Sequence, residues 1–169
     1  MHQVVIQFGV PKTLAPRPSL LRRWAECMLN QYHITAEVTI RIVDEEEMTH
    51  LNATYRHKQG ATNILSFPFC MPKEMETETN TAILGDLVIC AAIVNKEAQL
   101  SAPHDTRAKV IKQHQEAHWA HMVIHGLFHL LGYDHETEKE ASVMEALEIN
   151  QLKKLGFPNP YLNSENNPL

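Results

Sequence analysis

The stretch His-Gly-Leu-Phe-His-Leu-Leu-Gly-Tyr-Asp-His, residues 125–135, is the most informative part of this chain. His125 and His129 are one helical turn apart, about 6 Å along the axis, so both imidazoles can point at one ion. Gly132 then ends the helix, and His135 follows in a turn where the chain can fold back. Three nitrogen ligands that leave a fourth tetrahedral position for water are typical of a catalytic zinc site. We therefore expect one zinc ion per monomer, although nickel or copper would fit the same geometry in vitro.

Three further histidines precede this motif on the same predicted helix, which we place from about 105 to 131. Together with the first two motif histidines they form a stripe about 80° wide and about 22 Å long, too long for one ion. We expect His114 and His118 to be solvated or hydrogen-bonded side chains, not ligands. His121, one turn before His125, is a candidate for supporting that ligand or for touching substrate.

The motif resembles the metzincin metalloprotease signature, His-Glu-x-x-His-x-x-Gly-x-x-His. In those peptidases the glutamate after the first histidine is the general base. Gly126 occupies that position here, so the metal ligands are kept while the base of a peptidase is missing. A zinc metallopeptidase-like hydrolase stays an alternative, and the absent glutamate weighs against it.

Composition narrows the class of protein. The 169 residues are 44% hydrophobic and 21% charged, close to the globular average. The longest apolar run, 87–94, is far shorter than the roughly 20 residues of a membrane helix. The N-terminus predicts a first strand and not a signal peptide, and three scattered cysteines fit a reducing, cytoplasmic setting. The net charge of −5 argues against tight non-specific binding to nucleic acid and leaves room only for a local basic patch.

The remaining pattern alternates strands and helices, with one domain at 1–158 and a mobile polar tail at 159–169. We expect strands at 1–8, 38–42, 63–69 and 86–90, the third at a sheet edge because it contains Pro68. Helices are expected to begin at an N-cap Ser19, at a capping-box-like Asp44, at 91 and at 136, in addition to the long one. The acidic stretch 71–81 predicts an exposed loop.

Three stretches together resemble the YbeY family of bacterial endoribonucleases that mature ribosomal RNA. They are the 125–135 motif, the pair 51–56 (Leu-Asn-Ala-Thr-Tyr-Arg) and 62–68 (Thr-Asn-Ile-Leu-Ser-Phe-Pro), and 84–90 (Leu-Gly-Asp-Leu-Val-Ile-Cys). The resemblance runs from about 38 to 155, and the first 30 residues and the tail match poorly. Gln-Gly-Ala at 59–61 departs from the Asp-x-Pro that family members often carry.

The resemblance implies an α+β, zincin-like single domain with a four-stranded mixed sheet flanked by helices. It also implies zinc bound by His125, His129 and His135, and hydrolysis of single-stranded RNA in rRNA 3′-end maturation and ribosome quality control. The implied partners are rRNA, the small ribosomal subunit with its proteins, and assembly factors including GTPases, in the cytoplasm. The resemblance implies neither membrane nor DNA binding.

Arg56 matches the arginine of the family, and its chemistry suggests a role. A guanidinium can hold two phosphate oxygens as negative charge develops on them, so Arg56 is predicted to clamp the scissile phosphate. Its alternative role is a cation at a helix C-terminus. Zinc-bound water with a pKa near 7 supplies hydroxide without an obligatory protein base. Asp86 is expected to shape a turn or orient a site group. A non-catalytic ribosome-assembly factor with a regulatory metal site is the third possible class.

Overall fold

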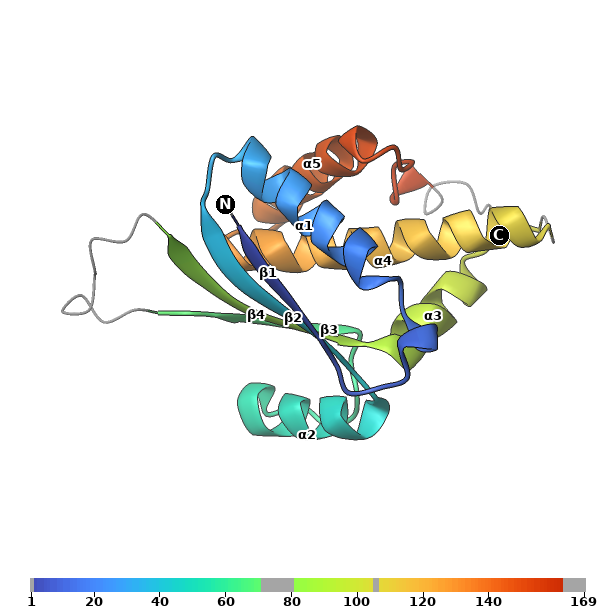
Figure 1. Ribbon diagram of the computed structural model, residues 1–169, viewed down its shortest axis with the longest axis horizontal. Coiled ribbons are helices and arrows are strands. Elements are labelled where there is room, and N and C mark those ends of the chain that lie inside the picture. Colours follow the sequence, from blue (N-terminus) through green and yellow to red (C-terminus); the bar gives the residue numbers. More distant parts are fainter. Residues whose placement is uncertain (1, 71–80, 105–106, 163–169) are drawn as a thin grey trace.

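A four-stranded mixed sheet is the centre of the molecule, with strand order β1-β2-β4-β3 (Figure 1). The computed structural model describes residues 2–70, 81–104 and 107–162. The strands β1 (Gln3–Phe8), β2 (Ala36–Val43) and β4 (Ala82–Cys90) are parallel, and β3 (Ile64–Pro68) pairs antiparallel with β4 at the edge. The edge position confirms the prediction from Pro68. Proline has no backbone N–H to donate, so it is disfavoured in a central strand, which pairs on both sides.

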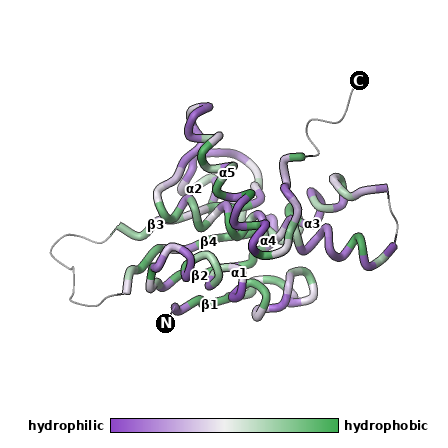
Figure 2. Tube along the Cα trace, turned by 90° about the horizontal axis from the view of Figure 1, so that it is seen from above, coloured by the Kyte–Doolittle hydropathy of each residue, from purple (hydrophilic) through white to green (hydrophobic). Residues whose placement is uncertain are grey.

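The helices are distributed unequally over the two faces of the sheet. The helices α1, α4 and α5 lie on one face, with α4 between the other two, and α2 crosses the opposite face (Figures 1 and 2). The short α3 follows β4 directly and packs against α4. The bounds are α1 Pro18–Gln31, α2 Glu45–Arg56, α3 Ala91–Leu100, α4 Ala108–Leu130 and α5 Glu138–Lys154, with a 3-10 turn at Lys12–Leu14. This is the single α+β domain with a four-stranded mixed sheet that the sequence predicts.

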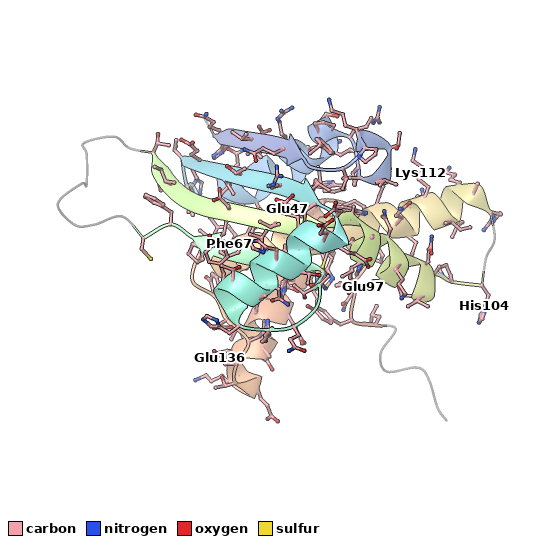
Figure 3. All side chains as sticks on the ribbon, turned by 90° about the horizontal axis from the view of Figure 1, so that it is seen from below. Glu47, Phe67, Glu97, His104, Lys112 and Glu136 are labelled. Atoms are coloured by element: carbon pink, nitrogen blue, oxygen red, sulfur yellow. The ribbon has the colours of Figure 1, made fainter. Side chains whose placement is uncertain are left out.

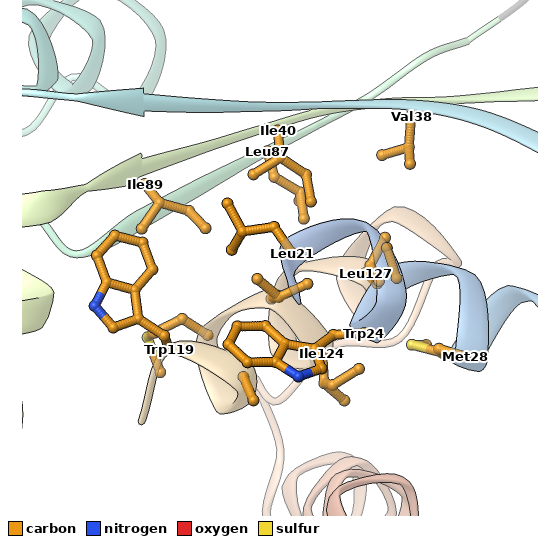
Figure 4. Close-up of a cluster of buried hydrophobic side chains, with 14 of the residues drawn as sticks. Leu21, Trp24, Met28, Val38, Ile40, Leu87, Ile89, Trp119, Ile124 and Leu127 are labelled. Atoms are coloured by element: carbon orange, nitrogen blue, oxygen red, sulfur yellow. The ribbon is translucent and has the colours of Figure 1, made fainter. Parts of the chain in front are cut away.

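The main core lies between the sheet and the pair α1 and α4 (Figure 4). The side chains of Ile40, Leu87 and Ile89 project from the sheet toward Trp119 and Leu127 of α4. Alternation along each strand turns every second residue to this side. The other side chains point to α2, where Met48 and Leu65 belong to a smaller cluster. The large core fixes α4, and with it both helical motif histidines, against the sheet.

The structure corrects several predicted boundaries. Helix α1 begins with Pro18 at its first position and Arg17 as N-cap, so Ser19 is not the cap. Proline is favoured there because the first helical N–H has no partner inside the helix. Asp44 does cap α2 by accepting from the Glu47 amide, whereas the Glu47 carboxylate binds Arg41 instead of closing the box.

The remaining corrections concern β4 and the last two helices. Strand β4 is longer than predicted because its ladder with β2 continues through a bulge opposite Glu37 and Val38. Helix α4 begins at Ala108, and α5 begins two residues later than predicted, with Thr137 and Glu140 forming its capping box.

Two predicted irregular segments fall partly outside the described residues. The predicted loop at 71–81 is described only at Thr81, and the predicted tail only from 159 to 162. The beginning of that tail is not free: Tyr161 is half-buried and hydrogen-bonds to α5 through its hydroxyl group. At this residue the tail is thus held against α5 by a buried acceptor, and mobility of 159–169 stays a prediction.

Candidate metal centre

The two helical histidines of the motif face each other at the C-terminal end of α4. Their Nε2 atoms are 3.1 Å apart, and both side chains are half-buried. Tetrahedral zinc with nitrogen ligands at 2.0–2.1 Å separates two ligand atoms by about 3.3 Å. The observed separation therefore fits a shared ion.

The third histidine reaches the same point after a sharp turn. Gly132 has φ +93°, a left-handed conformation that side-chain-bearing residues rarely adopt, and its amide donates to the His129 carbonyl. The exposed His135 ring then lies 5.5 Å from that of His125 and 5.0 Å from that of His129, between centroids. One ligand nitrogen from each histidine lies within 4.8 Å of the other two. The structure thus brings together the three residues that the spacing predicts.

The hydrogen bonds of the other ring nitrogens determine the tautomers. His125 Nδ1 lies 2.6 Å from the Glu148 carboxylate, and His129 Nδ1 lies 2.9 Å from the Tyr133 carbonyl oxygen. A carbonyl and an ionised carboxylate only accept, so both Nδ1 atoms must donate. In the neutral rings both Nε2 lone pairs therefore point toward one another. Two acceptors at this distance repel each other unless a proton or a metal cation lies between them, and paired imidazole nitrogens are a ligand set that zinc accepts.

The pKa values favour these protonation states. Burial lowers the pKa of His129 below its ordinary value of 6.5, and the imidazoles of His125 and His135 lower it further. Burial by itself raises the pKa of Glu148, but hydrogen bonds from His121, His125 and Tyr161 outweigh burial and lower it to about 2. A neutral His129 and an ionised Glu148 are therefore the favoured states near neutral pH.

Sequence reasoning missed Glu148, which is 1% exposed. It lies on α5 one turn from both Met144 and Leu152, which are buried residues on the same face. An acidic residue inside an apolar helical stripe is a signal that the sequence did contain. Its partner could not be named from that signal, because α4 and α5 meet only in the tertiary structure.

The three upstream histidines each have a partner outside α4. His114 Nε2 lies 3.0 Å from Ser101 Oγ, and His118 Nε2 lies 2.8 Å from Glu97. His121 Nε2 lies 2.8 Å from Glu148, so it contacts the same carboxylate as His125. The expected hydrogen bonds of His114 and His118 are present, and His121 lies behind the site, where it shares a carboxylate with His125.

Gly126 allows close contact between α4 and the sheet. A Cβ atom there would lie 2.7 Å from Ile64 Cδ1 and 2.8 Å from Leu87 Cδ2. The position thus faces the packed interface with β3 and β4, where any side chain would have to displace the ends of Ile64 and Leu87. This contact gives a packing reason for the residue that differs from the peptidase signature.

A cavity of about 630 Å³ opens beside the three histidines and also contacts Arg56 and the strand β3. Arg56 is the last residue of α2, yet its Nη2 donates to the Ser66 carbonyl oxygen at 2.5 Å. Its guanidinium carbon lies 5.6 Å from the centre of the Phe67 ring. Figure 3 shows Phe67 beside α2 on the face that this helix crosses. These contacts direct Arg56 across the sheet edge to the cavity.

Asp86 does not occupy the predicted place. It lies inside β4, paired with Thr39 of β2 and Phe67 of β3, and not in a turn. Its exposed side chain lines a separate cavity of about 420 Å³ with Arg41 and Tyr55, on the α2 side of the sheet. The turn predicted at Asp86 is therefore wrong, because this residue lies within a paired strand whose alternation turns it away from α4.

Comparison with known proteins identifies the family. The family model described as Endoribonuclease YbeY matches residues 15–156. This chain belongs to that family. A relative named Endoribonuclease YbeY from Nitrosococcus oceani is 45% identical over 158 residues, 94% of this chain and 95% of the relative. One of the same name from Pseudomonas syringae pv. syringae is 49% identical over 154 residues, 91% of this chain and 85% of the relative.

The similarity to the YbeY family extends further toward the N-terminus than predicted. The matched region begins at residue 15 and so includes all of α1, whereas the sequence suggested a poor match over the first 30 residues. Helix α1 packs on α4 through Trp24 and Met28, so it belongs to the same core as the site.

A solved structure supports the fold alone. The solution structure of TM1509 from Thermotoga maritima superposes with a TM-score of 0.56 and 24% identity, covering 98% of this chain and 94% of that one. Among the described residues, none of the helices has the length and apolar character needed to cross a bilayer.

Proposed function

We propose that this protein is a zinc-dependent endoribonuclease that cuts single-stranded RNA, with one ion per monomer held by His125, His129 and His135. The observation that carries the proposal is the 3.1 Å separation of the His125 and His129 Nε2 atoms, with a ligand nitrogen of His135 within 4.8 Å of both side chains' ligand atoms. Membership of the Endoribonuclease YbeY family supports the choice of RNA as substrate. When bound, the ion supplies Lewis-acid polarisation of a phosphoryl oxygen and activation of water.

Arg56 has the position of a phosphate clamp. It lines the same cavity as the histidines while its hydrogen bond to Ser66 and its stacking on Phe67 hold the guanidinium group. Of its five N–H donors, those not directed at Ser66 can bind phosphate oxygens in a fork. The contact with Ser66, a residue of β3, also argues against a role limited to the C-terminus of α2.

The biological setting follows the family. We propose that the substrate is ribosomal RNA during 3′-end maturation and ribosome quality control, in the cytoplasm. The protein would then act together with the small ribosomal subunit and assembly factors, and it would bind neither DNA nor membranes. The acidic net charge of −5 predicts few phosphate contacts and thus a shallow dependence of cleavage on salt.

The direct test compares RNA with protein as substrate. Purified protein loaded with zinc should cleave an unstructured RNA oligonucleotide, lose this activity with a chelator, and leave denatured casein intact. Metal-dependent degradation of casein would favour the peptidase alternative, which the absence of a glutamate at position 126 already disfavours. Metal binding without cleavage of any RNA would favour the assembly-factor alternative.

A further inference from the structure

A second cluster lies behind the metal centre, formed by Glu148, His121, His125 and Tyr161. The carboxylate of Glu148 has both oxygens engaged: Oε1 accepts from His125 Nδ1 at 2.6 Å and Oε2 accepts from His121 Nε2 at 2.8 Å. The Tyr161 hydroxyl also donates to Oε2. Three donors from two separate segments therefore hold one buried carboxylate.

This cluster has the spacing of a metal site, since ligand atoms of His121, His125 and Glu148 lie within 4.8 Å of one another. Its hydrogen bonds are nevertheless complete. An ion there would have to displace the protons that His121 and His125 donate, and Glu148 is only 1% exposed. The arrangement is instead that of a carboxylate that orients a ligand histidine, which fixes the tautomer and makes the ligand nitrogen more basic.

We infer that Glu148 is a positioning residue that holds His125 for metal binding, and that Tyr161 holds Glu148 in turn. The segment after α5 thereby contributes to metal affinity without touching the metal. Tyr161 is placed for this role by its ring, whose centroid lies 5.4 Å from that of His121. This inference rests on the proposed metal centre at His125, His129 and His135.

The same helix offers a matched control. His118 and Glu97 form a histidine–carboxylate pair at 2.8 Å, the same distance as the pair His121 and Glu148. Glu97 lies on α3 and does not contact a motif histidine in the described structure. Changing one histidine of each pair therefore separates the loss of a histidine–carboxylate bond from an effect on the metal centre.

The experiment measures zinc affinity of the full chain by competition with a chromophoric chelator. Glu148→Gln should lower the affinity by about ten- to a hundredfold. Tyr161→Phe, which keeps the ring and removes only the hydroxyl, and His121→Gln should each give a smaller loss. His118→Gln should bind zinc as the wild type does. The absorption spectrum of the cobalt-loaded protein should shift in Glu148→Gln and stay unchanged in His118→Gln.

The melting temperature of each metal-free variant separates folding from positioning. If Glu148→Gln does not fold, Tyr161→Phe carries the test. Wild-type affinity in both Glu148→Gln and Tyr161→Phe would overturn the inference, as would equal losses in His121→Gln and His118→Gln. A wild-type protein that binds no zinc would instead overturn the proposed metal centre itself.

Discussion

The two halves of α4 carry similar histidines in different surroundings. In the N-terminal half, His114 and His118 each direct Nε2 to a partner on α3 or at its C-terminus. In the C-terminal half, His125 and His129 use Nδ1 for hydrogen bonds and direct Nε2 toward each other. A histidine whose Nε2 contacts a partner on another element is therefore structural, whereas one that uses Nδ1 for its hydrogen bond leaves Nε2 as a candidate ligand atom.

The halves also differ in their distance from the sheet. Gly126 lets the C-terminal half approach β3 and β4, where the cavity with Arg56 opens. The N-terminal half packs on α3 and fills its inner side with Trp119. A histidine-rich helix thus becomes a candidate active site only where the sheet, the following turn and α5 converge on it.

The largest expected effect is the loss of metal binding in His129→Ala. Two nitrogen ligands do not complete a tetrahedral site, so stoichiometric zinc binding and chelator-sensitive RNA cleavage should both disappear. Elemental analysis of the purified variant measures the first, and His118→Ala in the other half of α4 should retain one zinc. Unchanged zinc in His129→Ala would show that the ligand assignment is wrong.

The next effect concerns Arg56, which touches the cavity from the α2 side. Arg56→Ala should keep its zinc and cleave RNA about a hundredfold more slowly. This is the lower end of the range expected for loss of a charged contact to the transition state, because the Arg56 side chain is exposed. Arg56→Lys should recover part of the rate, since it keeps the charge without the fork. A normal rate combined with a lowered melting temperature would assign Arg56 to the helix end instead.

A third prediction tests the close approach of α4 to the sheet. Gly126→Glu places atoms where Ile64 and Leu87 already pack, so it should lower the free energy of unfolding by about 1–3 kcal/mol or more. It should create no peptidase activity. Denaturant unfolding measures the loss in free energy of unfolding. Glu116→Gln, at a half-buried position in the N-terminal half of α4, serves as control. A stable Gly126→Glu protein that degrades casein would contradict both statements.

The smallest effect is a dependence of stability on acid. The pKa of Glu148 falls from 4.5 to about 2 on folding, so its contribution to stability is complete above pH 4.5 and is lost as the pH falls toward 2. Metal-free wild type should therefore lose more stability over this window than metal-free Glu148→Gln. Chemical denaturation of both proteins at pH 5 and pH 3 measures the difference, and equal losses would contradict the assignment.

The sequence by itself determined the local features of this protein. The spacing of the histidines, the glycine that ends α4 and the alternation along β2 act over a few residues, so helix and strand geometry suffices to predict them. The family followed from the same short stretches, and the matched family model confirms it.

Only the tertiary structure decided which residues share a site. Glu148 and Tyr161 lie behind His125 because α5 and the segment after it pack on α4. Asp86 lies outside the cavity of the histidines because the pleat of β4 turns its side chain to the α2 side of the sheet. Such contacts join residues far apart in sequence, and their geometry depends on how whole helices and strands pack. A local pattern carries no information about that packing, which is why the cluster of three histidines could be predicted and the residues behind it could not.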